Sequence, residues 1–236
     1  MLSVLVLFKK EMRSYFVSPL GYILACIFLI LSGLFFNGQS SIAGNFLILI
    51  LFICPIITIK LFSEEKRSGT IELLLTSPIT SLELVIGKFL SAFALYIIIL
   101  VPTISFVLLT AYYSPVNPDM GLVISSYLGL ILMGGSLIAI GVFASAVSQS
   151  QVIAGLIGFG VSIFFLLIYG ASNLLAEVFG LSNPLLRDIV EEISLLSHYF
   201  DFDKGIINTS NVIYYFLWMI LFLMLANKSI ESYNWK

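Results

Sequence analysis

A short charged stretch, residues 62–83, lies between two long apolar segments in the first half of the chain. Only 10% of the chain is Asp, Glu, Lys or Arg, so a concentration of charge in one internal connection is unusual. The charged side chains of this stretch are Glu64, Glu65, Lys66, Arg67, Glu72 and Glu83. Charges of both signs can form charge-assisted hydrogen bonds with a partner protein. We therefore predict a docking surface here; the alternative is a loop whose charges are merely solvated.

The sequence shows no catalytic pattern that would supply energy on this chain. It has no P-loop G-x-x-x-x-G-K-[ST], no H-E-x-x-H, no G-x-S-x-G and no cluster of Cys and His. The two cysteines, Cys26 and Cys54, fall inside apolar segments and are expected to be ordinary packing residues. An ion-driven carrier needs ionisable residues within its membrane helices, and the centres of the apolar segments have none. We expect no catalytic residue, cofactor or metal on this chain, with energy supplied by another protein.

The charged stretch is held between hydrophobic helices. The 236 residues are 60% hydrophobic, whereas soluble domains have about 45–50% apolar residues and about 25% charged ones. Runs of about 20 apolar residues can cross roughly 30 Å of hydrocarbon as helices. The predicted spans are residues 19–36, 42–61, 85–113, 122–147, 151–172 and 211–230. The fold class is thus an all-α integral membrane protein with one transmembrane domain, residues 1–236.

Three further segments are expected outside the spans. Residues 1–18 form an amphipathic helix in the membrane interface. Residues 62–84 form a loop with a short helix opened by Gly69 and Thr70, after which Thr80 and Glu83 make a capping box for the third span. Residues 173–210 form a helical segment on the opposite side that dips into the membrane, with a helix starting at Asn183-Pro184. His198 in that segment is expected to be structural.

The distribution of Lys and Arg sets the orientation, because cytoplasmic loops are enriched in them. With the N-terminus in the cytoplasm, two of the 11 Lys and Arg, Arg187 and Lys204, fall outside. The others are Lys9, Lys10, Arg13, Lys60, Lys66, Arg67, Lys88, Lys228 and Lys236. Both termini and residues 62–84 are therefore predicted to be cytoplasmic. A net charge of −2 gives no indication of nucleic-acid binding.

Small residues are concentrated in the fourth and fifth spans. The pairs Gly141/Ser145 and Ala154/Gly158 fit the small-xxx-small pattern, which lets membrane helices approach closely. The pattern favours packing within the chain, and the alternative is a subunit interface or a moving seam.

Residues 62–78, FSEEKRSGTIELLLTSP, resemble the coupling-helix signature of ABC-2 type transporter permeases. The resemblance extends to Phe8-Lys9-Lys10-Glu11 in the interfacial helix and to six spans, as in type V exporters. Residues 196–207, LSHYFDFDKGII, are most similar to the small permease of gliding-motility-associated ABC systems and its relatives in copper-enzyme maturation.

The resemblance implies a subunit of the bacterial cytoplasmic (inner) membrane that works with a second permease copy and two separate ABC ATPase subunits, which bind ATP and Mg²⁺. It also implies a possible partner with a large extracytoplasmic domain. The implied ATPase-coupling residues are Glu64, Glu65, Lys66, Arg67, Gly69, Thr70 and Glu72. The dimer seam would lie at the first and fifth spans, with close contacts at Gly155 and Gly158.

Three functions remain open from the sequence. The chain could be a permease that exports or extracts a lipid-like or envelope substrate, since polar residues in the spans are single Ser, Thr and Asn. It could be a mechanotransmitter that drives an envelope partner and moves no substrate. It could also be a passive scaffold in membrane lipid. Copurification with an ATPase separates the first two from the third.

Overall fold

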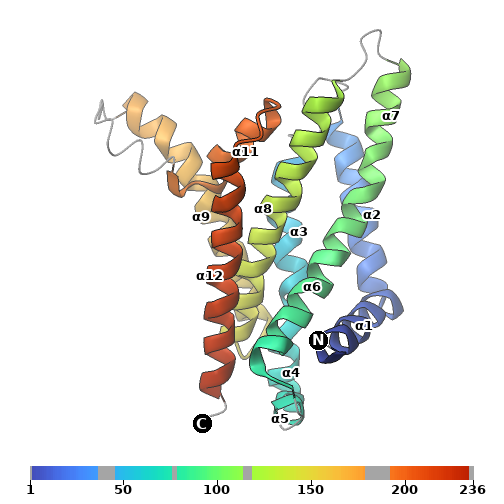
Figure 1. The fold of residues 1–236 in the computed structure, drawn as a ribbon, viewed down its shortest axis with the longest axis vertical. Helices are drawn as coiled ribbons and strands as arrows, with labels where there is room; N and C mark the ends of the chain where they lie inside the picture. The colour runs from blue at the N-terminus through green and yellow to red at the C-terminus, as the bar shows by residue number, and fades with distance from the viewer. Residues whose placement is uncertain (1, 37–45, 76–78, 114–118, 179–191, 234–236) are drawn as a thin grey trace.

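The computed structural model describes residues 2–36, 46–75, 79–113, 119–178 and 192–233 (Figure 1). Nearly all of these residues are helical, and none of them lies in a strand. The predicted fold class, an all-α integral membrane protein, is confirmed.

Five helical segments are long and apolar enough to span a membrane. One is Leu47–Ser68, made of α3 (Leu47–Thr58) and α4 (Lys60–Ser68), which corresponds to the second predicted span. Another is Ser81–Tyr113, which corresponds to the third. The others are α8 (Met120–Val147), residues Gln151–Ile168 of α9 (Gln151–Val178), and α12 (Thr209–Tyr233). A sixth arises if α1 (Leu2–Val17) and α2 (Pro19–Phe35), which meet at a bend of 68°, count as one span.

The span Ser81–Tyr113 is interrupted where the sequence has a proline. Helix α6 (Ser81–Leu100) passes through a 3₁₀ turn, η2 (Val101–Thr103), into α7 (Ile104–Tyr113). Pro102 lacks the backbone N–H that a regular helix would use, so the change in helix geometry falls at this proline. At its start, α6 carries the predicted capping box: the Thr80 side chain accepts from the Glu83 N–H, and the Glu83 side chain accepts from the Thr80 N–H.

Helix α8 is the centre of the bundle, in contact with α3, α6, α9, α11 and α12. Its glycines allow this because a side chain there would collide with a neighbour. A Cβ on Gly134 would lie 2.4 Å from the Tyr96 ring, and one on Gly141 would lie 2.0 Å from Thr58 Oγ1. Both contacts are within the chain, as the packing interpretation of the small residues requires.

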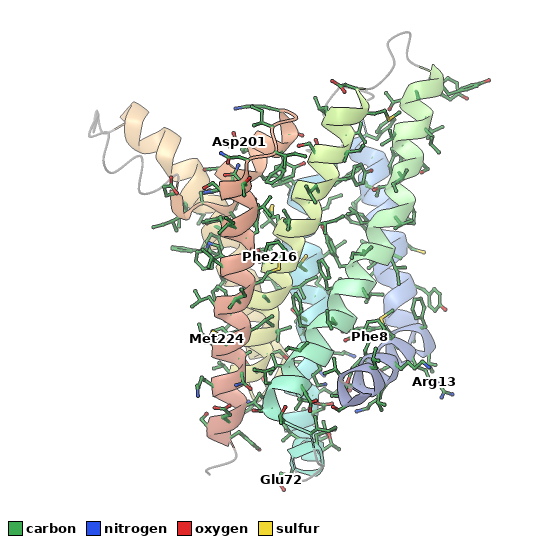
Figure 2. All side chains as sticks on the ribbon, in the orientation of Figure 1. Phe8, Arg13, Glu72, Asp201, Phe216 and Met224 are labelled. Carbon is green, nitrogen blue, oxygen red and sulfur yellow. The ribbon has the colours of Figure 1, made fainter. Side chains whose placement is uncertain are left out.

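The two ends of the bundle differ in what they carry. Helix α1, the short helix α5 (Thr70–Leu75) and the C-terminal end of α12 lie at the lower end in Figure 1. Helix α11 (Leu195–Asp203) and the end of α7 lie at the upper end. Figure 2 shows the same separation, with Glu72 at the lower tip and Asp201 at the upper end.

Helix α11 closes the upper end by packing against α8. Tyr199 and Phe202 are fully buried there, and the His198 ring stacks on Tyr214 with centroids 3.8 Å apart. The Nδ1 atom of His198 is 3.0 Å from the Ser194 carbonyl oxygen, so this histidine contributes to the packing of α11 against α12. The helix expected from Asn183-Pro184 lies mostly outside the described residues.

Two sequence-based predictions need correction. Residues 62–68 are not part of a loop: they continue the second span as α4, since Phe62 and Ser63 are buried and the following Glu, Lys and Arg are good helix formers. Gly155 and Gly158 are not placed at a seam between copies. Their Cβ positions would lie 3.1 Å from Ile59 and 3.3 Å from Pro55 of the same chain, so they serve contact with α3.

Candidate functional site

The charged stretch folds into two helices separated by one glycine. Helix α4 ends at Ser68, and Gly69 follows with φ 72° and ψ 2°, a left-handed conformation that favours glycine. Helix α5 then begins at Thr70 and buries Ile71 completely. Gly69 therefore sets the angle at which α5 leaves the second span, below the end of the bundle (Figure 1).

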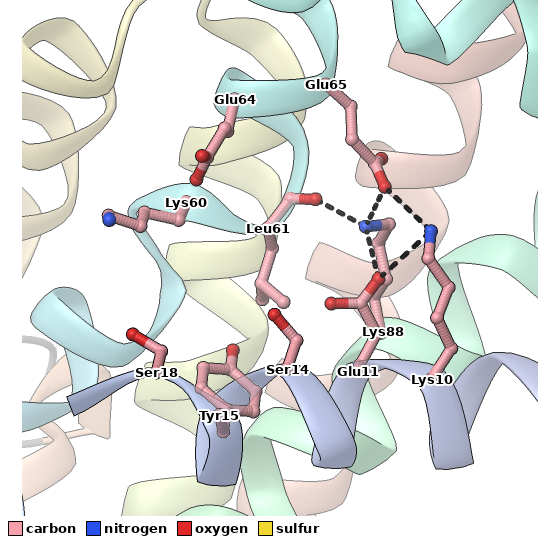
Figure 3. A pocket seen from close by; sticks show the side chains of 10 residues that line it. All are labelled: Lys10, Glu11, Ser14, Tyr15, Ser18, Lys60, Leu61, Glu64, Glu65 and Lys88. Carbon is pink, nitrogen blue, oxygen red and sulfur yellow. Dashed lines mark hydrogen bonds and ion pairs between the residues drawn. The ribbon is translucent and has the colours of Figure 1, made fainter. Parts of the chain in front are cut away.

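Glu65 of α4 points inward, to a buried lysine of α6 (Figure 3). Lys88 is 1% exposed, and its Nζ lies 2.8 Å from Glu65 Oε1 and 3.1 Å from Glu11 Oε1 of α1. It also donates to the Leu61 carbonyl oxygen at 2.6 Å. Lys10 lies 3.7 Å from the same Glu65 oxygen. These four charged residues join α1, α4 and α6 into one ion-pair cluster.

The next residue, Lys66, reaches the other side of the bundle. Its Nζ donates to the carbonyl oxygen of Ala146, in the last turn of α8, where carbonyls lack helical partners. The same ammonium lies 5.2 Å from the ring centre of Tyr233 in α12. The Ala146 oxygen also accepts from Ser229 of α12 at 3.1 Å. Consecutive residues of α4 thus contact opposite parts of the bundle.

A serine of α8 fixes the junction between α3 and α4. Ser145 Oγ accepts from the backbone N–H groups of Phe62 and Ser63, at 2.9 and 3.1 Å, and donates to the Ile59 carbonyl oxygen at 3.0 Å. The irregular turn at Ile59 leaves these backbone groups in need of partners, and burial would make unpaired ones costly. Helix α4 is therefore held to α8 at its start and to α1, α6 and α12 further along.

The remaining predicted residues of the site face outward. Glu64, Arg67, Gly69, Thr70 and Glu72 are exposed. Within the described part of the chain, Glu64, Arg67 and Glu72 form no ion pair. Glu72 lies at the tip of the lower end (Figure 2). The structure thus divides the predicted residues into an outward surface on α4 and α5 and an inward pair, Glu65 and Lys66.

The sequence reasoning missed the partners of that inward pair. Lys88 was placed at a span end without a partner, and Glu11 was noted only as part of α1. A signal was present for Lys88, because it is an isolated charge among apolar residues in a segment that must meet lipid or protein. The sequence pattern marks Ser145 only as a small residue, whereas in the structure its hydroxyl forms hydrogen bonds with the backbone at the α3–α4 junction. No group of three or more potential metal ligands is found among the described residues.

Comparison with known families shows the class of protein to which the chain belongs. The family model described as ABC-2 family transporter protein matches residues 35–229, which include α4, α5 and Lys88. A comparison with curated proteins gave no match. Permeases of this family are generally non-catalytic membrane subunits, typically dimeric, that act with an ABC ATPase. The chain belongs to the ABC-2 transporter family and is the membrane permease subunit of an ABC transporter.

Proposed function

We propose that the chain couples ATP hydrolysis by a separate ATPase subunit to the export or extraction of a lipid-like or envelope substrate. The observation that carries the proposal is the double attachment of α4: Glu65 binds α1 and α6, whereas Lys66 binds α8 and α12. An ATPase bound to α5 and the outward face of α4 can thereby move both sides of the bundle at once.

The ATPase contact is assigned to the exposed charges next to Gly69. Arg67 and Glu72 flank the turn between α4 and α5, and neither forms an ion pair among the described residues. Charged side chains that pair across a desolvated interface cost about 2–5 kcal/mol when truncated. ATP and Mg²⁺ bind the ATPase, and this chain transmits the movement.

The complex is proposed to contain two permease copies in a bacterial inner membrane, with both termini in the cytoplasm. The Lys and Arg distribution supports this orientation, because the end that carries α1, α5 and the end of α12 holds most of them. The second copy is proposed to contact α2 and α9. Since Gly155 and Gly158 face α3, that contact uses the exposed side of α9, where Val152 and Leu156 are 73% and 69% exposed.

A lipid-like substrate fits the polar groups of the spans. Buried hydroxyls such as Ser91, Thr103 and Ser162 donate to carbonyls of their own helices, at 2.7, 2.6 and 3.0 Å. They are thus satisfied locally and leave no row of free polar groups for a hydrophilic substrate among the described residues.

The test separates docking from transmission. The chain is purified from native membranes as wild type, as Arg67→Ala/Glu72→Ala and as Glu65→Gln, and both the recovered ATPase and its ATP hydrolysis are measured. We expect the double variant to lose the ATPase. Glu65→Gln should retain it while ATP hydrolysis responds less to the permease, since the ion pairs of α4 with α1 and α6 are lost and only the hydrogen bond from Lys88 to the Leu61 carbonyl remains.

Lys9→Ala/Arg13→Ala is the matched control, because it removes exposed charges of α1 at the same end. It should leave ATPase recovery unchanged. Full ATPase recovery with Arg67→Ala/Glu72→Ala would refute the docking assignment, and no ATPase with the wild-type chain would refute the function.

A further inference from the structure

A cavity of about 360 Å³ lies between α1, α4 and α6, beside the ion-pair cluster (Figure 3). Its wall includes Lys60 and Glu64 of α4 as well as Ser14 and Tyr15 of α1. Helix α1 carries exposed apolar and cationic side chains, as a helix at a membrane surface does. The cavity therefore lies at the depth of lipid headgroups.

A row of exposed side chains leads along the second span into this cavity. Ile48, Phe52 and Ile56 of α3 are spaced four residues apart and are 56%, 49% and 37% exposed. Residues four apart are neighbours on a helix surface, and the spacing continues to Lys60 and Glu64. Because each step of four turns slightly more than a full turn, the row winds around the helix from beside Phe159 of α9, which Phe52 meets, to the cavity. The row thus presents apolar surface, then a cation, then an anion.

The charges at the end of the row are available to a ligand. Neither Lys60 nor Glu64 forms an ion pair with another described residue, and both are exposed. Beside them, Lys88 has three N–H donors, and these are taken by Glu11, Glu65 and the Leu61 carbonyl. Glu65 Oε2 is buried and has no hydrogen-bond partner among the described residues. Glu65, which lines the cavity, thus keeps one oxygen that can accept a hydrogen bond from a ligand.

We propose that this cavity binds a membrane phospholipid whose headgroup carries a primary ammonium. The acyl chain lies along Ile48, Phe52 and Ile56, the phosphate pairs with Lys60, and the ammonium pairs with Glu64 and donates toward Glu65. The order of the lipid groups, acyl chain, phosphate and ammonium, then matches the order of apolar residues, cation and anion along the row. A choline headgroup has no N–H to donate, and a glycerol headgroup has no cation for Glu64.

The site has a consequence for coupling that goes beyond the proposed function. The lipid occupies the space beside the cluster through which α1, α4 and α6 are joined. Its headgroup would stabilise that contact, so the response of α4 to an ATPase depends on the lipid composition of the membrane.

The test measures which lipid the full chain retains. The protein is placed in nanodiscs that contain equal amounts of phosphatidylethanolamine, phosphatidylcholine and phosphatidylglycerol, and bound lipids are counted by native mass spectrometry after release. We expect ethanolamine lipid to be retained about tenfold over either of the others, which corresponds to ~1.4 kcal/mol. Equal retention of the three, or preference for the glycerol lipid, would overturn the proposal.

The sharpest variant is the exchange Lys60→Glu/Glu64→Lys, which keeps the net charge and reverses the order of the two charges. It should reduce the ethanolamine preference to near unity. The matched control is Lys228→Glu/Glu231→Lys, an equivalent exchange of an exposed pair outside the cavity, which should keep the preference. An unchanged preference in the Lys60/Glu64 exchange refutes the site.

If the Lys60→Glu/Glu64→Lys variant does not fold, the single variant Glu64→Gln tests the lipid site, because it removes the charged partner of the lipid ammonium at an exposed position. It should abolish discrimination between ethanolamine and choline lipids, and retained discrimination would refute the site. Recovery of the ATPase from native membranes is measured for the same variants. Failure of the wild-type chain to recover an ATPase, with its lipid preference intact, counts against the proposed function alone, and recovery of an ATPase by a wild-type chain that shows no lipid preference counts against the lipid site alone.

Discussion

Replacement of Lys88 by Met tests whether the ion-pair cluster holds α1, α4 and α6 together. Lys88 is 1% exposed, whereas Glu11 and Glu65 are each 14% exposed, so the substitution leaves two partly buried carboxylates without their shared cation. Removal of one partner from a buried ion pair costs about 3–5 kcal/mol. Because the carboxylates keep some solvent, we expect the low end, about 3 kcal/mol.

For a domain of this size, ~3 kcal/mol corresponds to a fall of roughly 6–12 °C in the unfolding midpoint. The midpoint can be followed in detergent with a thiol-reactive dye, because Cys54 is buried and becomes accessible on unfolding. Cys26 is exposed, so a Cys26→Ser background removes its signal. Lys60→Met is the matched control, since it removes an exposed lysine on the same cavity wall, and its midpoint should stay close to that of the background.

The triple variant Lys88→Met/Glu11→Gln/Glu65→Gln completes the argument. It removes the uncompensated charges together with the lysine, so most of the lost stability should return. The reasoning is refuted if Lys88→Met unfolds at the background temperature. It is also refuted if the triple variant is less stable than Lys88→Met, because the loss would then come from packing and not from unpaired charge.

Three further predictions use the same unfolding assay. Ser145→Ala should cost about 1–3 kcal/mol because two buried backbone N–H groups lose their acceptor, and a midpoint equal to the background would show that the α3–α4 junction does not need it. Thr80→Ala should cost about 0.5–2 kcal/mol through loss of the α6 cap, and Thr80→Ser should restore stability, which a cap-independent effect would not allow. Gly158→Leu should lower the unfolding midpoint of the isolated chain, because the new side chain meets Pro55 of α3. If the chain keeps its midpoint and loses only the permease dimer, Gly158 lies at the dimer seam instead.

Local sequence signals predicted the parts of the fold that depend on short-range chemistry. The capping box at Thr80 and Glu83 needs only neighbouring residues, and both hydrogen bonds are present. The change in helix geometry at Pro102 likewise follows from one missing N–H. The positions of the spans follow from apolar length alone, as bilayer thickness requires.

The direction in which charged residues point could not be predicted in the same way. Glu65 and Lys66 read as loop residues because they are polar and follow an apolar segment. Their inward orientation depends on α4 continuing the helix of α3 and on the positions of α6 and α8, which are tertiary properties. The small-residue pattern at Gly155 and Gly158 has a similar limit, since close helix contact has the same signature within a chain and between chains.

The most direct measurement of the central claim is a photo-crosslink from the tip of α5. A photoreactive residue is placed at Glu72 or, as a control, at Asp201, which lies at the opposite end of the bundle (Figure 2). Native membranes are irradiated, and the adducts are identified by mass spectrometry. The account predicts an adduct with an ABC ATPase from position 72 and none from position 201. An ATPase adduct from position 201, or its absence from position 72, would contradict the account.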